Sequence, residues 1–268
     1  MIKGIIKAYV YRLRKSIRLI IIYSVGLGGG IILLAMLPGF FAPKAYTPQT
    51  QQALETLAME ILGAHTAISV GAIEAIVSAI FSSYLASITA SVVASFSIAN
   101  LFREDRSEGV FEVLFSAPAS RREILIAVLI YTLLAAFIAE AVVMAITSII
   151  SLLPLYLLGY LSNLGSYYVE LILLLGFAPP ILVSLISLFL NVAAPSLGNI
   201  RTGFGPGHNL LNAISILPAL IPLLILSLDP QIGAIKIAVY TDIASVILVV
   251  ILLLLLPRIW KEESLVRS

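Results

Sequence analysis

The stretch FREDRSEGVFEVLFSAPASRREI, residues 102–124, decides how the rest of the chain is arranged. It places eight charged side chains between Arg103 and Arg122, whereas the sequence on either side is almost continuously apolar. Each flanking run is long enough to cross a bilayer, which takes about 20 residues of α-helix. The pattern therefore predicts a charged hairpin that joins two membrane-spanning helices.

The composition is that of a polytopic membrane protein. Hydrophobic residues make up 60% of the 268 residues and charged residues 11%, against roughly 25% charged residues in soluble domains. We expect an all-α fold and a single transmembrane domain over residues 1–268, because this length holds about six spans with short connections. The sequence contains no cysteine, which excludes disulfides and thiolate metal sites.

Hydropathy predicts six transmembrane helices. A segment of about 21 residues rises about 31 Å as an α-helix, which matches the hydrocarbon core of a bilayer. The charged hairpin, residues 103–122, then connects the second span to the third. The predicted spans are residues 17–37, 72–102, 123–149, 168–192, 210–228 and 237–257.

Basic residues are distributed unequally between the two ends of these spans. If the N-terminus is inside, fourteen Lys and Arg residues fall on the cytoplasmic side, and only Lys44 and Lys236 fall outside. Short basic loops of membrane proteins face the cytoplasm. We therefore expect a multi-pass protein of the cytoplasmic (plasma) membrane, with both termini and the charged hairpin in the cytoplasm.

Residues 1–16 predict an amphipathic helix at the membrane surface. Apolar and basic side chains recur there at helical spacing on different faces. In such a helix the basic face meets lipid headgroups and the apolar face lies in the acyl boundary. The alternative is a basic tail that only sets the topology. The apolar positions are Ile2, Ile5, Ile6, Tyr9, Leu13 and Ile17, and the basic positions are Lys3, Lys7, Arg14 and Arg18.

Within the hairpin, the residues before Pro118 predict a short helix. Proline cannot continue a helix, so this one ends near Ser116. Ser120 and Glu123 have the spacing of a capping box, which would start the third span. The alternative is a loop helix that rests on the membrane surface. The apolar face of the helix carries Val110, Phe111, Leu114 and Phe115, and the acids that recur four residues apart are Glu104, Glu108 and Glu112.

These residues resemble the signature of the ABC-2 type permeases, the transmembrane subunits of ATP-binding cassette transporters. The family pattern runs roughly R-E, G-T-L-E-x-L, P-V-S-R and E-I-x-x-G-K. Ala127 and Val128 stand where the family usually has glycine and lysine. Six spans, an interfacial N-terminal helix and a cytoplasmic C-terminus are also what the family would have. The matching residues are Arg103-Glu104, Glu108 to Leu114, Ser116 to Arg121 and Glu123-Ile124-Leu125.

The resemblance implies the permease subunit of an exporter that works by alternating access. Its implied partners are a separate ATPase subunit, which would bind ATP and Mg²⁺, a second permease copy or related chain, and membrane lipid, but no nucleic acid. The chain has no G-x-x-x-x-G-K-[ST] loop, so we expect no cofactor of its own and no enzyme activity by itself. The implied ATPase-docking residues are Glu104, Glu108, Val110, Phe111, Glu112, Leu114, Phe115, Pro118 and Arg121.

Small residues in the first two spans predict close helix packing or the wall of a translocation path. Glycine and serine at every fourth position let membrane helices approach closely. The two interpretations agree if these spans form the seam of a dimer. The residues concerned are Gly26 and Gly30 in the first span and Ser83, Ser87, Ser91 and Ser95 in the second.

Glu140 is the deepest acid in the predicted spans. A charge at such depth costs several kcal/mol unless it is hydrated, paired or protonated. An alternative function follows, an ion-coupled secondary carrier that uses Glu140 or Asp242 as a proton relay.

Prolines and histidines complete the sequence-based expectations. Pro179 with Pro180 predicts a kink in the fourth span, because neither residue has an amide hydrogen. Histidine occurs only at His65 and His208, far from any acid cluster, so no metal site is expected.

Overall fold

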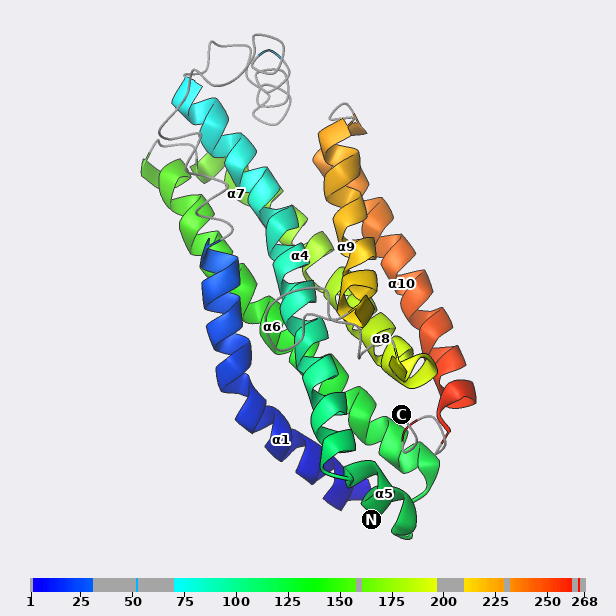
Figure 1. The fold of residues 1–268 in the computed structure, drawn as a ribbon. Helices are drawn as coiled ribbons and strands as arrows, with labels where there is room; N and C mark the ends of the chain where they lie inside the picture. Colours follow the sequence, from blue (N-terminus) through cyan, green and yellow to red (C-terminus); the bar gives the residue numbers. More distant parts are fainter. Residues whose placement is uncertain are drawn as a thin grey trace.

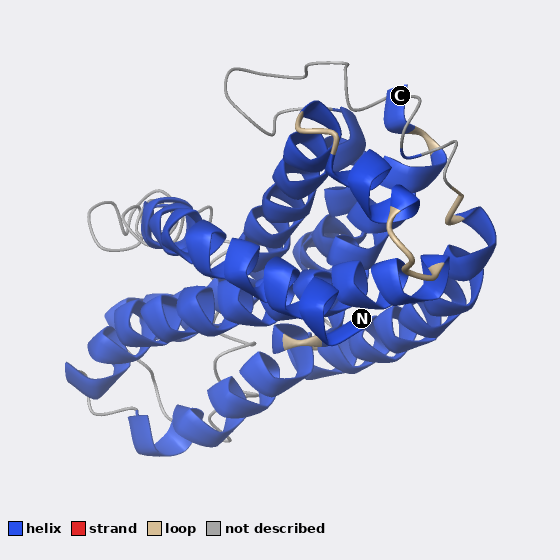
Figure 2. Ribbon diagram, turned by 90° about the horizontal axis from the view of Figure 1, so that it is seen from below, coloured by secondary structure: helices blue, strands red, loops and turns tan. Residues whose placement is uncertain are grey.

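The computed structural model describes residues 2–30, 52, 70–157, 161–196, 210–228, 232–261 and 265. Over these ranges the regular elements are all helices, as Figure 2 shows from the lower end of the bundle. The all-α prediction is therefore confirmed for the described part of the chain. The helices are α1 (Ile2–Tyr23), α4 (Val70–Ser107), α5 (Val110–Ser116), α6 (Arg121–Leu157), α7 (Leu161–Gly176), α8 (Ala178–Ala193), α9 (Leu210–Leu228) and α10 (Ala234–Ile259).

Five stretches of these helices are long and apolar enough to cross a membrane. They correspond to the second to sixth predicted spans, and α9 has the predicted bounds. The predicted first span, residues 17–37, lies only partly inside the described residues, where its apolar stretch is Ser16–Leu27. The count of six is therefore still a prediction. The five stretches are Ala79–Ser107, Arg121–Leu153, Ser166–Ala193, Leu210–Leu228 and Ala234–Ile259.

The longest helices, α4 and α6, pack against each other along the bundle (Figure 1). Both extend beyond the predicted limits of residues 72–102 and 123–149. Hydropathy locates only the apolar segment that crosses the membrane. The helix itself can be longer, because arginine and glutamate are good helix formers that continue it into water. The charged residues at the end of α4 therefore stand on a rigid helix and not on a loop.

The fourth predicted span, residues 168–192, corresponds to the apolar stretch Ser166–Ala193, and it is interrupted close to the predicted kink. The chain breaks between α7 and α8 at Phe177, with Pro179 and Pro180 in the first turn of α8. Prolines in the first turn of a helix are tolerated, but they cannot donate to carbonyls of the preceding turn. By contrast, Pro218 and Pro222 lie inside α9 without ending it.

The N-terminal helix has no break near residue 16. It runs from Ile2 to Tyr23 and continues as a π-helical segment, η1 (Ser24–Gly29). Its apolar face, with Ile5, Tyr9 and Leu13, is buried in the protein core, and α1 packs on α6. A separate interfacial helix over residues 1–16 is therefore not confirmed, because this face covers protein where lipid was expected.

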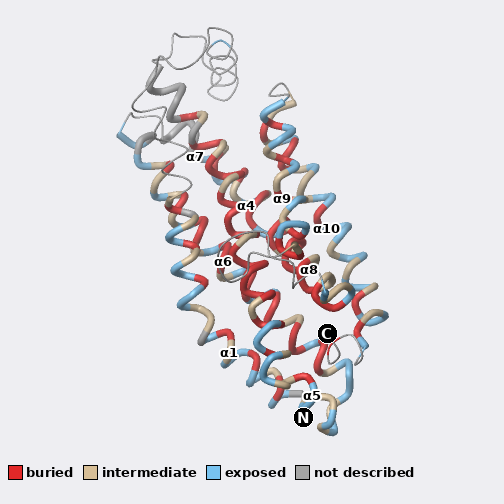
Figure 3. Tube along the Cα trace, in the orientation of Figure 1, coloured by how far each residue is buried: buried red, intermediate tan, exposed pale blue. Residues whose placement is uncertain are grey.

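Burial is concentrated in α4 and the helices around it, while the outer faces of α1 and α10 are exposed (Figure 3). The exposed side chains of α10 are mostly large and apolar, as expected for a surface that meets lipid. The beginning of α1, α5 and the end of α10 gather at the lower end of the bundle (Figure 1). Ile5, Phe111 and Trp260 belong to one core cluster there.

Candidate functional site

Helix α5 is fixed at both ends by local backbone chemistry. Gly109 precedes it in the left-handed region, with φ 67° and ψ 22°, which glycine adopts without steric cost. After Pro118, the Ser120 amide donates to Glu123 Oε2 over 2.9 Å, and the Glu123 amide donates to Ser120 Oγ over 3.3 Å. The predicted short helix and the predicted capping box are both present.

The inner face of α5 is attached to the bundle by an aromatic cluster. The ring of Phe111 lies 5.5 Å from that of Phe102 in α4 and 6.5 Å from that of Trp260 after α10. The sequence-based prediction lists Phe111 among the docking residues. Its side chain is only 1% exposed, however, so it is not available for insertion into a partner. It anchors α5 instead, and half-buried Leu114 and Phe115 pack against the same core.

The outer face of α5 is open to solvent. Val113, which the sequence-based list of docking residues lacks, is 67% exposed. Glu112, Ser116 and Pro118 are exposed beside it, while Val110 is half-buried. A small apolar patch flanked by an acid therefore faces away from the bundle. Glu104, Glu108 and Arg121 are exposed nearby, at the adjoining ends of α4 and α6.

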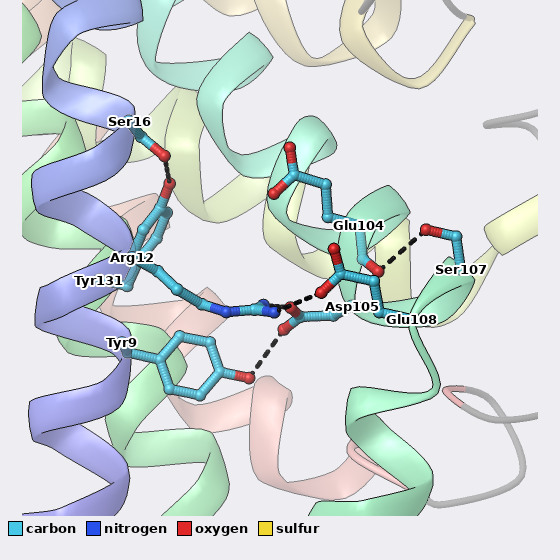
Figure 4. Close-up of polar contacts among 8 residues, drawn as sticks. All are labelled: Tyr9, Arg12, Ser16, Glu104, Asp105, Ser107, Glu108 and Tyr131. Carbon is cyan, nitrogen blue, oxygen red and sulfur yellow. Dashed lines mark hydrogen bonds and ion pairs between the residues drawn. The ribbon is translucent and has the colours of Figure 1, made fainter.

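A polar cluster joins α1 to the end of α4 (Figure 4). Asp105 is completely buried and forms an ion pair with Arg12. Arg12 also contacts Glu108, with Nη2 3.0 Å from Oε2. The Tyr9 hydroxyl donates to Asp105 Oδ2 over 2.9 Å. A buried carboxylate is stable only when it is paired and hydrogen-bonded, and this cluster provides both.

Burial raises the pKa of the Tyr9 phenol above its ordinary value, partly offset by the nearby charge of Arg12. Tyr9 therefore remains a hydrogen-bond donor to Asp105. Sequence reasoning missed this cluster because Asp105 lies in a run of charges that looks solvated. The available signal was Arg12, which lies next to the predicted apolar face of the first helix.

Tyr131 of α6 extends the cluster upward. Its hydroxyl donates to Ser16 Oγ over 3.3 Å and lies 3.2 Å from Ser97 Oγ, so it connects α1, α4 and α6. A pocket of about 30 Å³ lies beside it and is lined in part by Ser16, Ser97, Asn100 and Glu104. That volume holds about one water molecule.

Arg106 ties α4 to α8. Its Nη2 donates to the Asn191 carbonyl over 2.5 Å, and its guanidinium lies 5.6 Å from the centre of the Phe102 ring. Ion pairing, cation–π contact and aromatic packing therefore all converge at the lower end of α4, next to α5.

The serine stripe of α4 is buried inside one chain. Ser87 donates to the Leu175 carbonyl over 2.8 Å, and Ser95 to Asn212 Oδ1 over 2.9 Å. Ser83 and Ser91 donate to carbonyls of α4 itself. The stripe therefore packs against α7 and α9 of the same chain, and side chains buried this way are not available to a second copy.

The two glycines of the first span are placed differently from the serines. A Cβ added at Gly26 or Gly30 would meet nothing within 4 Å. Exposed Ile22 and Val25 lie close to them in sequence. Among the described residues, nothing covers this side of the N-terminal helix.

Glu140 is 3% exposed, and neither carboxyl oxygen has a hydrogen-bond partner among the described residues. Asp242 is only half-buried, on α10. Within the described residues no group of acids and histidines could hold a metal ion. His65 and His208 lie outside those residues.

Comparisons of the chain with protein-family models, curated proteins and solved structures found no match.

Proposed function

We propose that the chain is the transmembrane permease subunit of an ATP-driven ABC transporter, an exporter energised by a separate ATPase subunit. The observation that carries the proposal is the two-sided nature of α5. One side, through Phe111, is locked into the bundle, and the other presents exposed Val113 and Glu112. An element that only rested on the membrane would have no need for this ordered outer face.

In this proposal, force on α5 reaches most of the bundle directly. Phe111 passes it to the ends of α4 and α10 through Phe102 and Trp260. The α4 end in turn is joined to α1 by the pair of Arg12 and Asp105. Closure of the ATPase subunits on ATP and Mg²⁺ would thus rock several spans together and alternate access to the two sides of the membrane.

The orientation that fits this proposal puts α5 and both chain ends in the cytoplasm. The support is the clustering of basic residues at that end, because positively charged segments stay inside. A second permease copy or a related chain would cover the side of the first span that carries Gly26 and Gly30. The support there is the open space around both glycines.

Positive charge introduced on the outer face of α5 tests the proposal. Glu112→Lys and Val113→Lys change exposed side chains, so the fold should persist. Each should weaken association with the cognate ATPase about tenfold, since central interface side chains contribute more than about 1 kcal/mol. Co-purification and ATP turnover in the same lipid are the measurements. Lys7→Glu, on the exposed side of α1, is the matched control and should have no effect. Normal coupling in both α5 variants would refute the proposal.

An ion-coupled secondary carrier is the second candidate, favoured by the buried and unpartnered carboxyl of Glu140. Such a carrier would work without an ATPase. Liposomes containing the chain alone would then dissipate an imposed proton gradient, followed with a pH-sensitive dye, and Glu140→Gln would abolish this. An unchanged gradient would exclude this candidate and leave the ATP-driven proposal standing.

A further inference from the structure

The break between α7 and α8 leaves two backbone carbonyls without their helical donors. In a continuous helix, the carbonyls of Leu175 and Gly176 would accept from the amides four residues later. Those positions are Pro179 and Pro180, which have no amide hydrogen. The Ser87 hydroxyl replaces the missing donor at Leu175, over 2.8 Å. The adjacent Gly176 carbonyl has lost its helical donor in the same way.

Glu140 lies beside this position. A Cβ added at Gly176 would stand 3.4 Å from Glu140 Oε1 and 3.8 Å from Met144 Cε. The carboxyl group is therefore in near contact with the broken backbone, and glycine allows that approach. Glu140 is enclosed, yet both of its oxygens lack a hydrogen-bond partner. No ion pair to Glu140 occurs among the described residues.

The break is suited to a cation and not to an anion. The C-terminal end of α7 carries partial negative charge. The first turn of α8 would normally offer amides to an anion, but Pro179 and Pro180 have none and the Ile181 amide donates to Phe177. The Glu140 carboxyl group therefore lies beside a helix end that carries partial negative charge. Two such groups without a counter-charge are strongly unfavourable in a low-dielectric interior.

We propose that Glu140 and the Gly176 carbonyl form a binding site for one small monovalent cation, a proton or Na⁺. Interrupted membrane helices place carbonyls and helix C-terminal ends around such ions. In the proton-loaded form, the Glu140 hydroxyl would donate to the Gly176 carbonyl. In the sodium-loaded form, Na⁺ would replace that proton between the same oxygen atoms. The site needs no ATPase, so it stands or falls independently of the proposed function.

Infrared spectroscopy of the full chain in lipid nanodiscs tests the site. In sodium-free choline buffer near neutral pH, the wild-type spectrum should contain the C=O stretch of a protonated carboxylic acid. Glu140→Gln should lose this band. Glu170→Gln should keep it, because Glu170 is an exposed acid on α7 and serves as the matched control. Added NaCl separates the two cations: loss of the band together with higher thermal stability indicates Na⁺, and an unchanged band indicates a proton.

Pro180→Ala tests the carbonyl without touching the acid. Alanine supplies an amide hydrogen that competes for the Gly176 carbonyl, so the carboxylic acid band should shift to higher frequency or the sodium response should be lost. Absence of both a Glu140-dependent band and a sodium response in the wild type would overturn the site. If Pro180→Ala leaves both the band and the sodium response unaltered, the Gly176 carbonyl is not part of the site. That result would overturn the proposal as stated.

Discussion

Arg12 of α1 forms an ion pair with Asp105 of α4, and Asp105 is completely buried although its neighbours Arg103 and Glu104 are exposed. The pair sits one turn from Glu108, directly before the turn that leads into α5. It therefore connects the N-terminal helix to the turn that precedes α5.

Removal of one partner of this pair should be costly. Arg12→Ala leaves the Asp105 carboxylate buried without a counter-charge, so we expect a loss of about 3–5 kcal/mol. Glu108→Gln removes an exposed contact of the same arginine and should cost less than about 1 kcal/mol. Thermal unfolding of the purified protein compares the two. Equal stability of both variants would show that the pair is not an anchor.

The aromatic cluster should hold α5 in place. Phe111→Ala removes a buried ring, which typically costs about 3–5 kcal/mol, and should expose the hairpin to proteases. Val113→Ala, about half a turn away on the exposed face, should leave the digestion pattern unchanged. Limited proteolysis followed by mass spectrometry locates the cuts. A protected hairpin in Phe111→Ala would contradict the anchoring role.

The left-handed turn before α5 requires glycine. Gly109→Ala forces a side chain into φ 67°, with the new Cβ 3.1 Å from Glu112 Oε2, at a cost of about 1–2 kcal/mol. Gly4→Ala is the control, because a Cβ there meets nothing within 4 Å and alanine favours helix. We therefore expect a lower melting temperature for the first variant only, and equal shifts would refute the argument.

Crosslinking tests the proposed contact of the N-terminal helix with a second copy. The chain has no native cysteine, so Val25→Cys should crosslink between copies in membranes, whereas buried Ser87→Cys should not. Gel mobility under non-reducing conditions gives the answer. Crosslinks from Ser87 alone would place the contact on the opposite side of the bundle.

The sequence predicts local features of this fold well. Pro118 ends α5 as predicted, and the spacing of Ser120 and Glu123 gives the capping box, because these signals act within a few residues. The direction in which a side chain points depends on distant partners. Phe111 was predicted to be an ATPase-docking residue, but Trp260, far along the chain, packs against it. The partner of Asp105 was missed for the same reason.

Helix breaks are only partly predictable from the sequence, because they depend both on local residues and on distant partners. The double proline at Pro179 predicts a disturbance, but its form depends on whether other groups satisfy the freed carbonyls. Ser87 does so at Leu175, next to the interruption at Phe177. Pro222 in α9 has the same local chemistry, and the helix continues through it.

The π-helical segment η1 has a consequence for insertions and deletions in this chain. Its hydrogen bonds span five residues where an α-helix spans four, so it accommodates one residue more than an α-helical turn. Deletion of one residue between Ser24 and Gly29 would convert the segment to α-helix and leave the face of α1 that carries Tyr9 and Arg12 in register. The helix that runs from Ile2 through η1 thus contains one extra residue at Ser24–Gly29, and its loss would not disturb the base of the bundle.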